Sequence, residues 1–118
     1  MISRSLIAWL GAFLFTQAIE VPIYSFALRR VSPVKWTIAI AFGASLITHP
    51  VVWFVIPKIG IASYWSYVAV AESFAVLAEA IYVSFFGLPI AQAFAWSLVA
   101  NGLSAGIGLL CRRWLGWP

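Results

Sequence analysis

Four long apolar segments, separated by short polar or helix-breaking stretches, set the pattern of this chain. They cover roughly residues 6–28, 37–56, 66–86 and 90–111. Each is close to the length of about 20 residues that an α helix needs to cross the hydrocarbon core of a bilayer. Because the connections are short, consecutive helices should run in opposite directions. The pattern predicts an all-α, integral membrane four-helix bundle, a single transmembrane domain over residues 1–118 with antiparallel neighbours and short loops.

The composition strengthens this interpretation. Hydrophobic residues account for 64% of the 118 positions, and charged residues for only 8%. A soluble domain of this size leaves too much of its surface exposed to hide so many apolar side chains. We therefore expect the lipid bilayer to be the main partner of the chain. The single cysteine, Cys111, cannot form an internal disulfide.

The basic residues explain the net charge of +4 without nucleic acid. All of them fall at the edges of apolar segments, where Lys and Arg side chains meet anionic lipid headgroups. They are Arg4, Arg29, Arg30, Lys35, Lys58, Arg112 and Arg113. No nucleic-acid-binding motif is present, and we expect no nucleic-acid partner.

The basic residues are divided almost evenly between the two sides of the predicted bundle. Four lie on the side of the N-terminus and three on the other, too even a split for the positive-inside rule. The α-amino group of Met1 favours an orientation with both termini cytoplasmic, in what we expect to be a bacterial-type inner (cytoplasmic) membrane. The first segment follows Arg4 and contains Thr16-Gln17-Ala18, as a signal peptide with its cleavage site can. We expect it to be retained as a transmembrane helix.

All three acidic residues and the only histidine lie inside the apolar segments: Glu20, His49, Glu72 and Glu79. A charge at the bilayer centre costs about 2.5–3.5 kcal/mol on insertion scales, so such residues normally face the bundle interior. A rise of 1.5 Å per residue predicts two layers about 10 Å apart. One layer holds His49 and Glu72 with Asn101 close by, and the other holds Glu20 and Glu79. We predict a polar site for a proton, an ion or a substrate from these five residues.

Further polar residues and two prolines surround this predicted site. The supporting residues are Thr48, Pro50, Pro22, Tyr24, Tyr82, Ser97 and Ser104. The serines and the threonine fall on the same helix faces as the site residues by i, i+3, i+4 spacing. The two tyrosines lie one turn from Glu20 and Glu79 and can either bond to them or sit at the membrane interface.

The roles of two prolines and of one pair of glycines can each be interpreted in two ways. Pro22 and Pro50 free the carbonyls of Ala18 and Leu46. These carbonyls can serve as ligands, or the prolines simply kink the helices to improve packing. The spacing of Gly102 and Gly106 permits close helix approach, either within the bundle or between two copies.

Three functions are compatible with the polar site. Carboxyl and imidazole groups exchange protons in pumps and transporters, which favours proton- or ion-coupled transport of a small, cationic solute by a homo-oligomer. The same groups suit a divalent metal ion such as Mn or Fe, with His49 and Glu72 as first ligands and Glu20 and Glu79 as further ones. A metal-bound water would then make the chain an intramembrane hydrolase acting on a lipid or membrane-embedded substrate. The third possibility is a non-catalytic membrane subunit that binds a partner protein of a larger complex.

The size and four-span layout resemble those of the small multidrug resistance transporters. That resemblance implies one essential Glu in the first helix and a functional dimer, and Glu20 lies in the corresponding segment. Two features depart from the pattern of that family, namely the Thr-His-Pro of residues 48–50 and the two Glu of the third segment. We assign the chain to no family and assign no catalytic residue.

Overall fold

Four long helices make up nearly all of the computed structural model, which describes residues 3–118. α1 spans Arg4–Leu28, α2 Val34–Phe54, α3 Tyr64–Phe85 and α4 Ile90–Leu115, with a short 3-10 helix, η1, at Ile56–Ile59. No strand occurs within residues 3–118. Each of these four helices is long and apolar enough to cross a membrane; the second span includes both α2 and η1. The prediction of an all-α, four-helix chain is confirmed.

Local capping explains why the helices begin earlier than the apolar pattern predicts. The Ser3 side chain accepts a hydrogen bond from the Leu6 amide (3.2 Å), and Ser63 accepts one from the Ser66 amide (3.0 Å). Serine at such an N-cap satisfies an amide that the first helical turn leaves free. α2 begins directly after Pro33. α4 begins after Pro89, as predicted, but continues beyond residue 111 to Leu115.

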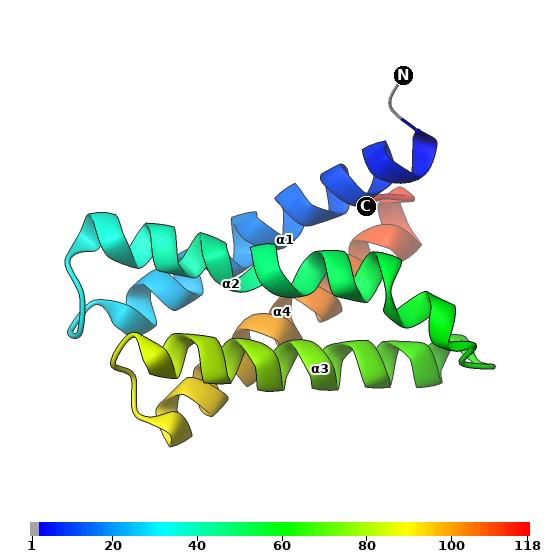
Figure 1. Cartoon of the computed structure of the whole chain (residues 1–118). Coiled ribbons are helices and arrows are strands. Elements are labelled where there is room, and N and C mark those ends of the chain that lie inside the picture. The colour runs from blue at the N-terminus through cyan, green and yellow to red at the C-terminus, as the bar shows by residue number, and fades with distance from the viewer. Residues whose placement is uncertain (1–2) are drawn as a thin grey trace.

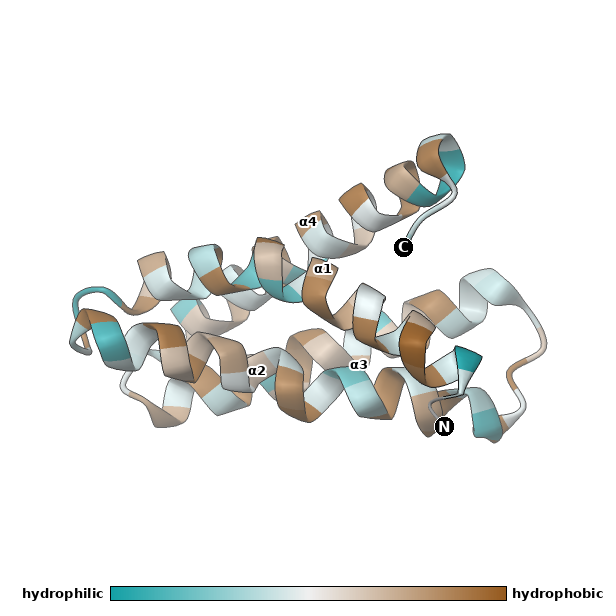
Figure 2. Ribbon diagram, turned by 90° about the horizontal axis from the view of Figure 1, so that it is seen from above, coloured by the Kyte–Doolittle hydropathy of each residue, from teal (hydrophilic) through white to brown (hydrophobic). Residues whose placement is uncertain are grey.

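The four helices form a closed ring in which each contacts its two neighbours. α1 packs on α2 and α4, and α3 packs on α2 and α4, while the backbones of the diagonal pairs α1–α3 and α2–α4 do not approach each other within residues 3–118. The α1–α2 and α3–α4 turns lie at one end of the bundle, and both chain ends lie at the other, with the α2–α3 connection (Figure 1). Toward its C-terminal end, α4 diverges from α2 and α3 (Figure 2).

Proline does not interrupt either helix that contains it. α1 continues through Pro22 and α2 through Pro50. The residues that carry the freed carbonyls, Ala18 and Leu46, both lie on the outer surface of the bundle. The structure therefore gives no support to these carbonyls as ligands for an interior site, and the alternative, that the prolines shape the helices for packing, stays a prediction.

Small residues allow the helices to approach closely. Ala41, Ala44, Ala93 and Ala100 are completely buried. They belong to an apolar cluster that fills the bundle toward the α1–α2 and α3–α4 turns, together with larger residues such as Leu28. Small side chains at helix contacts permit the dense packing that holds helices together in lipid. This end of the bundle is therefore filled by side chains.

The outer surface of the bundle is mainly apolar, unlike the surface of a soluble protein. Large apolar side chains are exposed on every helix, and hydrophobic positions occur along the length of the helices (Figure 2). A soluble monomer rarely exposes so much contiguous apolar surface. Gly102 and Gly106 face this outer surface, since an added Cβ at either would meet no atom within 4 Å. The glycine pair does not serve packing inside the bundle.

We predict that Ala44→Leu lowers the free energy of unfolding by about 1–3 kcal/mol, because the added atoms have no space between the helices. Ala39→Leu is the matched control, because Ala39 lies on the exposed face of the same helix. It should change stability by less than about 0.5 kcal/mol. Unfolding of the purified protein in detergent micelles, followed by circular dichroism, measures both. Equal losses in the two variants would contradict this packing.

Candidate functional site

Glu79 on α3 lies at the centre of a hydrogen-bond network that joins all four helices. Its Oε1 accepts from the Tyr24 hydroxyl of α1 (2.7 Å) and from the Asn101 amide of α4 (3.1 Å). Its Oε2 accepts from the Thr48 hydroxyl of α2 (2.6 Å). The carboxyl group is only 1% exposed. Both oxygens are thus satisfied without water, as a buried polar group requires.

Ser97 supports the same network from α4. Its hydroxyl donates to the Val76 carbonyl of α3 (2.8 Å) and lies 3.1 Å from the Tyr24 hydroxyl. The Asn101 amide nitrogen also donates to the Ser97 carbonyl, one turn earlier on the same helix (3.0 Å). Ser97 therefore fixes the positions of two of the donors to Glu79.

Glu20 on α1 is held in a similar way by two serines. Its Oε1 accepts from Ser45 of α2 (2.6 Å), and its Oε2 accepts from Ser104 of α4 (2.5 Å). Glu20 is also only 1% exposed. Short bonds from hydroxyl groups to a carboxyl group are the strong kind of hydrogen bond. Each carboxyl oxygen of Glu20 therefore has a donor from a different neighbouring helix.

Within residues 3–118, no Lys or Arg side chain balances these buried carboxyl groups. All seven Lys and Arg residues are exposed, and every side-chain donor to Glu20 and Glu79 within residues 3–118 is a hydroxyl or an amide. Burying an unpaired charge in a medium of low dielectric is costly. The site consequently favours a proton or another cation as the missing counter-charge.

His49 lies beside this network in an aromatic surrounding. Its Nε2 is 3.4 Å from the Thr16 hydroxyl, and its Nδ1 is buried without a hydrogen-bond partner in the described chain. The rings of Trp9, Phe13 and Trp53 surround the imidazole, at centroid distances of 5.6–6.2 Å. The imidazole ring is therefore held mainly by packing.

The ionisable side chains line one small cavity, which we call the inner chamber. It has a volume of about 130 Å³. Its walls include Glu20, His49, Glu72, Glu79 and Asn101, together with Thr16, Ser45, Thr48 and Ser104. A chamber of this size can hold a small ion or a few water molecules, since water occupies about 30 Å³ in the liquid. All five predicted site residues thus lie around one space.

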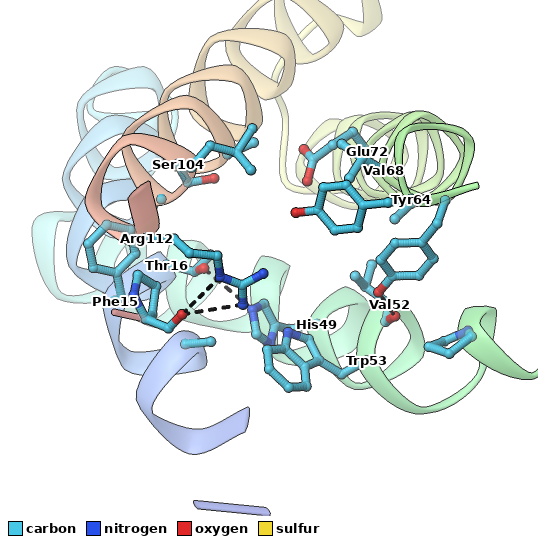
Figure 3. Close-up of a pocket in the computed structure, with 18 of the residues that line it drawn as sticks. Phe15, Thr16, His49, Val52, Trp53, Tyr64, Val68, Glu72, Ser104 and Arg112 are labelled. Atoms are coloured by element: carbon cyan, nitrogen blue, oxygen red, sulfur yellow. Dashed lines mark hydrogen bonds between the residues drawn. The ribbon is translucent and has the colours of Figure 1, made fainter. Parts of the chain in front are cut away.

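A larger pocket, which we call the vestibule, adjoins the inner chamber. It has a volume of about 550 Å³ and opens toward the end of the bundle that carries both chain ends. Figure 3 shows Glu72, His49 and Trp53 directed into it from α3 and α2, and Arg112 from α4. His49 and Glu72 line both the vestibule and the inner chamber. These two residues therefore stand at the boundary between the two spaces.

The predicted partners inside the site differ from those in the structure. Asn101 bonds to Glu79, not to the layer of His49 and Glu72. Tyr24 reaches across the bundle to Glu79 instead of bonding to Glu20 on its own helix. The helix spacing predicts the depth of each residue, but the direction and length of the side chains decide which groups meet.

Some supporting residues lie outside the network. Tyr82 is half-buried, its ring is tilted against that of Phe86 (5.1 Å between centroids), and its hydroxyl fills the space that a Cβ at Gly43 would need. Pro22 is exposed, and Pro50 is half-buried without lining either space. Thr48, Ser97, Ser104 and Tyr24, in contrast, all belong to the network.

The four candidate metal ligands are not gathered into one ligand set. Within residues 3–118, no group of three or more His, Cys, Asp or Glu side chains is placed to hold a metal ion. The carboxyl oxygens of Glu20 and Glu79 already accept bonds from protein donors. The geometry therefore gives no support to a divalent metal site built from His49, Glu72, Glu20 and Glu79.

The sequence pattern overlooked some of the residues that shape the site. The polar face of the second segment, with Ser45, Thr48 and His49, follows from helical spacing, but the bond from Ser45 to Glu20 does not. Arg112 lines the vestibule, although its position at the end of an apolar segment indicated only a lipid anchor. Tyr67 also lines the vestibule and donates to the Val52 carbonyl (2.7 Å). No sequence signal distinguishes it from an interfacial tyrosine.

We predict that Thr48→Val destabilises the protein by about 1 kcal/mol more than Thr37→Val, because it leaves Glu79 Oε2 without its donor. Thr37 is a matched control, since it is equally buried but bonds only to the Val34 carbonyl of its own helix. Unfolding in detergent micelles measures the difference. If the two variants lost the same stability, the Thr48–Glu79 bond would contribute nothing.

The chain matches no protein-family model, no curated protein and no solved structure. Function therefore follows from the geometry and chemistry of the inner chamber and the vestibule.

Proposed function

We propose that the chain is an integral membrane transporter that couples the movement of a small, positively charged solute to protons or another cation. One observation carries the proposal: two carboxyl groups, each 1% exposed and without a basic partner, line a chamber that borders an open vestibule. Ionisable groups inside a membrane bundle mark proton relays and ion pathways. Glu20 and Glu79 form the coupling site, and Glu72 and His49 form the boundary with the solute.

The asymmetry of the bundle supports a site that opens to one side at a time. The vestibule leads from the end with both chain ends toward the inner chamber, whereas the apolar cluster fills the opposite end. A transporter exposes its site alternately to the two sides by rearranging helices around it. We infer that this structure corresponds to the state open toward the chain ends, and that the apolar cluster must open to release solute on the other side.

The setting in the membrane follows from the same arrangement. We propose that the end bearing the chain ends is cytoplasmic, in a bacterial-type inner membrane. Arg4, Lys58, Arg112 and Arg113 lie at this end, against three basic residues at the other. The α-amino group of Met1, which added to this side, lies outside the described residues. We also propose a homo-oligomer, with the exposed Gly102–Gly106 face of α4 as the contact between copies.

Flux measurements test the coupling site. We expect Glu20→Gln and Glu79→Gln each to lower proton-coupled flux in proteoliposomes by at least tenfold, since glutamine keeps the size of the side chain but cannot exchange a proton. Thr37→Val, a buried change outside the chamber, should retain the flux of the original chain. A pH-sensitive dye trapped in the vesicles provides the measurement. Flux at the original level in both Glu variants would remove the proposal.

Chemical labelling tests the one-sided opening. In a background with Cys111→Ser, we expect Val52→Cys to react with a water-soluble maleimide at least ten times faster than Val83→Cys. Val52 lines the vestibule, whereas Val83 is completely buried in the apolar cluster. The labelling rate in reconstituted vesicles, with reagent on either side, is followed by mass spectrometry. Equal rates at the two positions would contradict an end closed by apolar packing.

A further inference from the structure

The vestibule carries one carboxyl group and one guanidinium group at different depths. Glu72 of α3 lies at its inner end, where the vestibule borders the inner chamber. Arg112 of α4 also lines the vestibule and is exposed (Figure 3). In the described chain Glu72 makes no side-chain hydrogen bond. The guanidinium of Arg112 makes only two long contacts, both with the Pro118 oxygen (3.3 Å), so most of its five donors are free.

The register of α3 and α4 gives the separation of these two groups along the bundle. The bond from Ser97 to the Val76 carbonyl places these residues at the same level. Arg112 follows Ser97 by 15 residues, and Glu72 precedes Val76 by 4, so the two differ by 11 residues or about 16 Å. Side chains lean toward the N-terminus of their helix. Because α3 and α4 are antiparallel, the Glu72 side chain leans toward the open end of the vestibule and the Arg112 side chain leans toward the inner chamber. The distance between the two charged groups along the bundle is therefore shorter than the distance between their Cα atoms.

Apolar and aromatic side chains line the vestibule between the two charges. Phe15, Val52, Trp53 and Val68 are directed toward the same space (Figure 3). Its volume of about 550 Å³ falls within the range of about 300–1,000 Å³ that is usual for small-molecule sites. A ligand that fills this space needs an apolar body as well as charged ends.

We propose that the vestibule binds a zwitterion whose ammonium group and anionic group lie at opposite ends of an apolar body. The ammonium pairs with the Glu72 carboxylate at the inner end, and the anionic group pairs with the Arg112 guanidinium at the outer end. The inference rests on the proposed transport function, for which it names the class of solute. It extends that proposal, because the positive charge of the solute is accompanied by a negative one.

Charge complementarity explains why a zwitterion is preferred to either half. An anion without the ammonium leaves Glu72 unpaired and is repelled by it. A cation without the anionic group pairs with Glu72 but gains nothing from Arg112. Opposed charges in a binding site select partners mainly by penalising those that lack the complement. The affinity for the zwitterion should therefore exceed the affinity for each half.

A matched set of three compounds tests the proposal by isothermal titration calorimetry in detergent micelles. The zwitterion is 4-(aminomethyl)benzoate, the cation alone is 4-methylbenzylamine, and the anion alone is 4-methylbenzoate. We expect the zwitterion to bind at least tenfold more tightly than either of the others. If either single-charge compound binds as tightly as the zwitterion, or if none of the three binds, the proposal is wrong.

Three variants assign the two ends of the ligand. Glu72→Gln should remove the preference for the zwitterion over 4-methylbenzoate, and Arg112→Gln should remove its preference over 4-methylbenzylamine. Arg113→Gln is the matched control, because Arg113 is the neighbouring basic residue and does not line the vestibule. It should retain both preferences. Circular dichroism confirms that each variant is folded, and an unchanged preference in folded Glu72→Gln would overturn the proposal.

The result of these binding experiments can be separated from the result of the transport experiments. Binding in micelles requires neither a gradient nor movement of the solute. If the Glu20 and Glu79 variants keep their flux while the zwitterion preference holds, the coupling proposal fails and the ligand class stands. If flux depends on Glu20 and Glu79 but the zwitterion is not preferred, transport stands and the ligand class is wrong.

Discussion

Two carboxyl groups held inside an apolar bundle without a basic partner are the constraint on which the rest of this structure depends. Glu20 and Glu79 take five hydrogen bonds from protein donors, and these donors come from α1, α2 and α4. A half-satisfied polar network would be more costly than an apolar core. Each helix must therefore turn its polar stripe inward at the level of the carboxyl groups. This requirement fixes the rotation of every helix, and small residues such as Ala44 and Ala100 then allow the close approach that short bonds demand.

The same constraint makes the bundle asymmetric. Toward the α1–α2 and α3–α4 turns the interior is filled mainly with Leu, Ile, Val and Ala, because the carboxyl and imidazole groups of the described residues line the inner chamber instead. Toward the chain ends, α4 diverges from α2 and α3 (Figure 2), and the vestibule at this end is lined by His49, Trp53 and Tyr67 among others. Packed apolar side chains exclude water, whereas a pocket with polar groups can admit it. The closed and open ends thus reflect the different chemistry of the two halves of the interior.

The hydrophobic pattern was sufficient to predict the four helices and to place Glu20, His49, Glu72, Glu79 and Asn101 around one interior. Helical periodicity determines which face is polar, and lipid leaves few other places for ionisable groups. The hydrogen-bond partners inside the site could not be predicted from helical periodicity. Tyr24 crosses to Glu79, and Asn101 joins it there, because long side chains reach beyond the level of their own Cα atoms. The position of Arg112 in the vestibule was also not predictable, since a basic residue at a helix end is equally typical of a lipid anchor.

The three glutamates differ in their hydrogen-bond partners, and this difference indicates how solute binding and proton or cation binding are linked in the proposed function. Glu20 and Glu79 are saturated with protein donors, whereas Glu72 has none and faces the vestibule. Glu72 and Glu79 lie two turns apart on α3, and both line the inner chamber. In the proposed function, a positive group bound at Glu72 therefore changes the free energy of placing a proton or cation at Glu79. Such coupling is reciprocal, so occupation of Glu79 changes the affinity at Glu72 by the same factor. In the proposed function, a bundle this small couples two ligands because their sites share one wall.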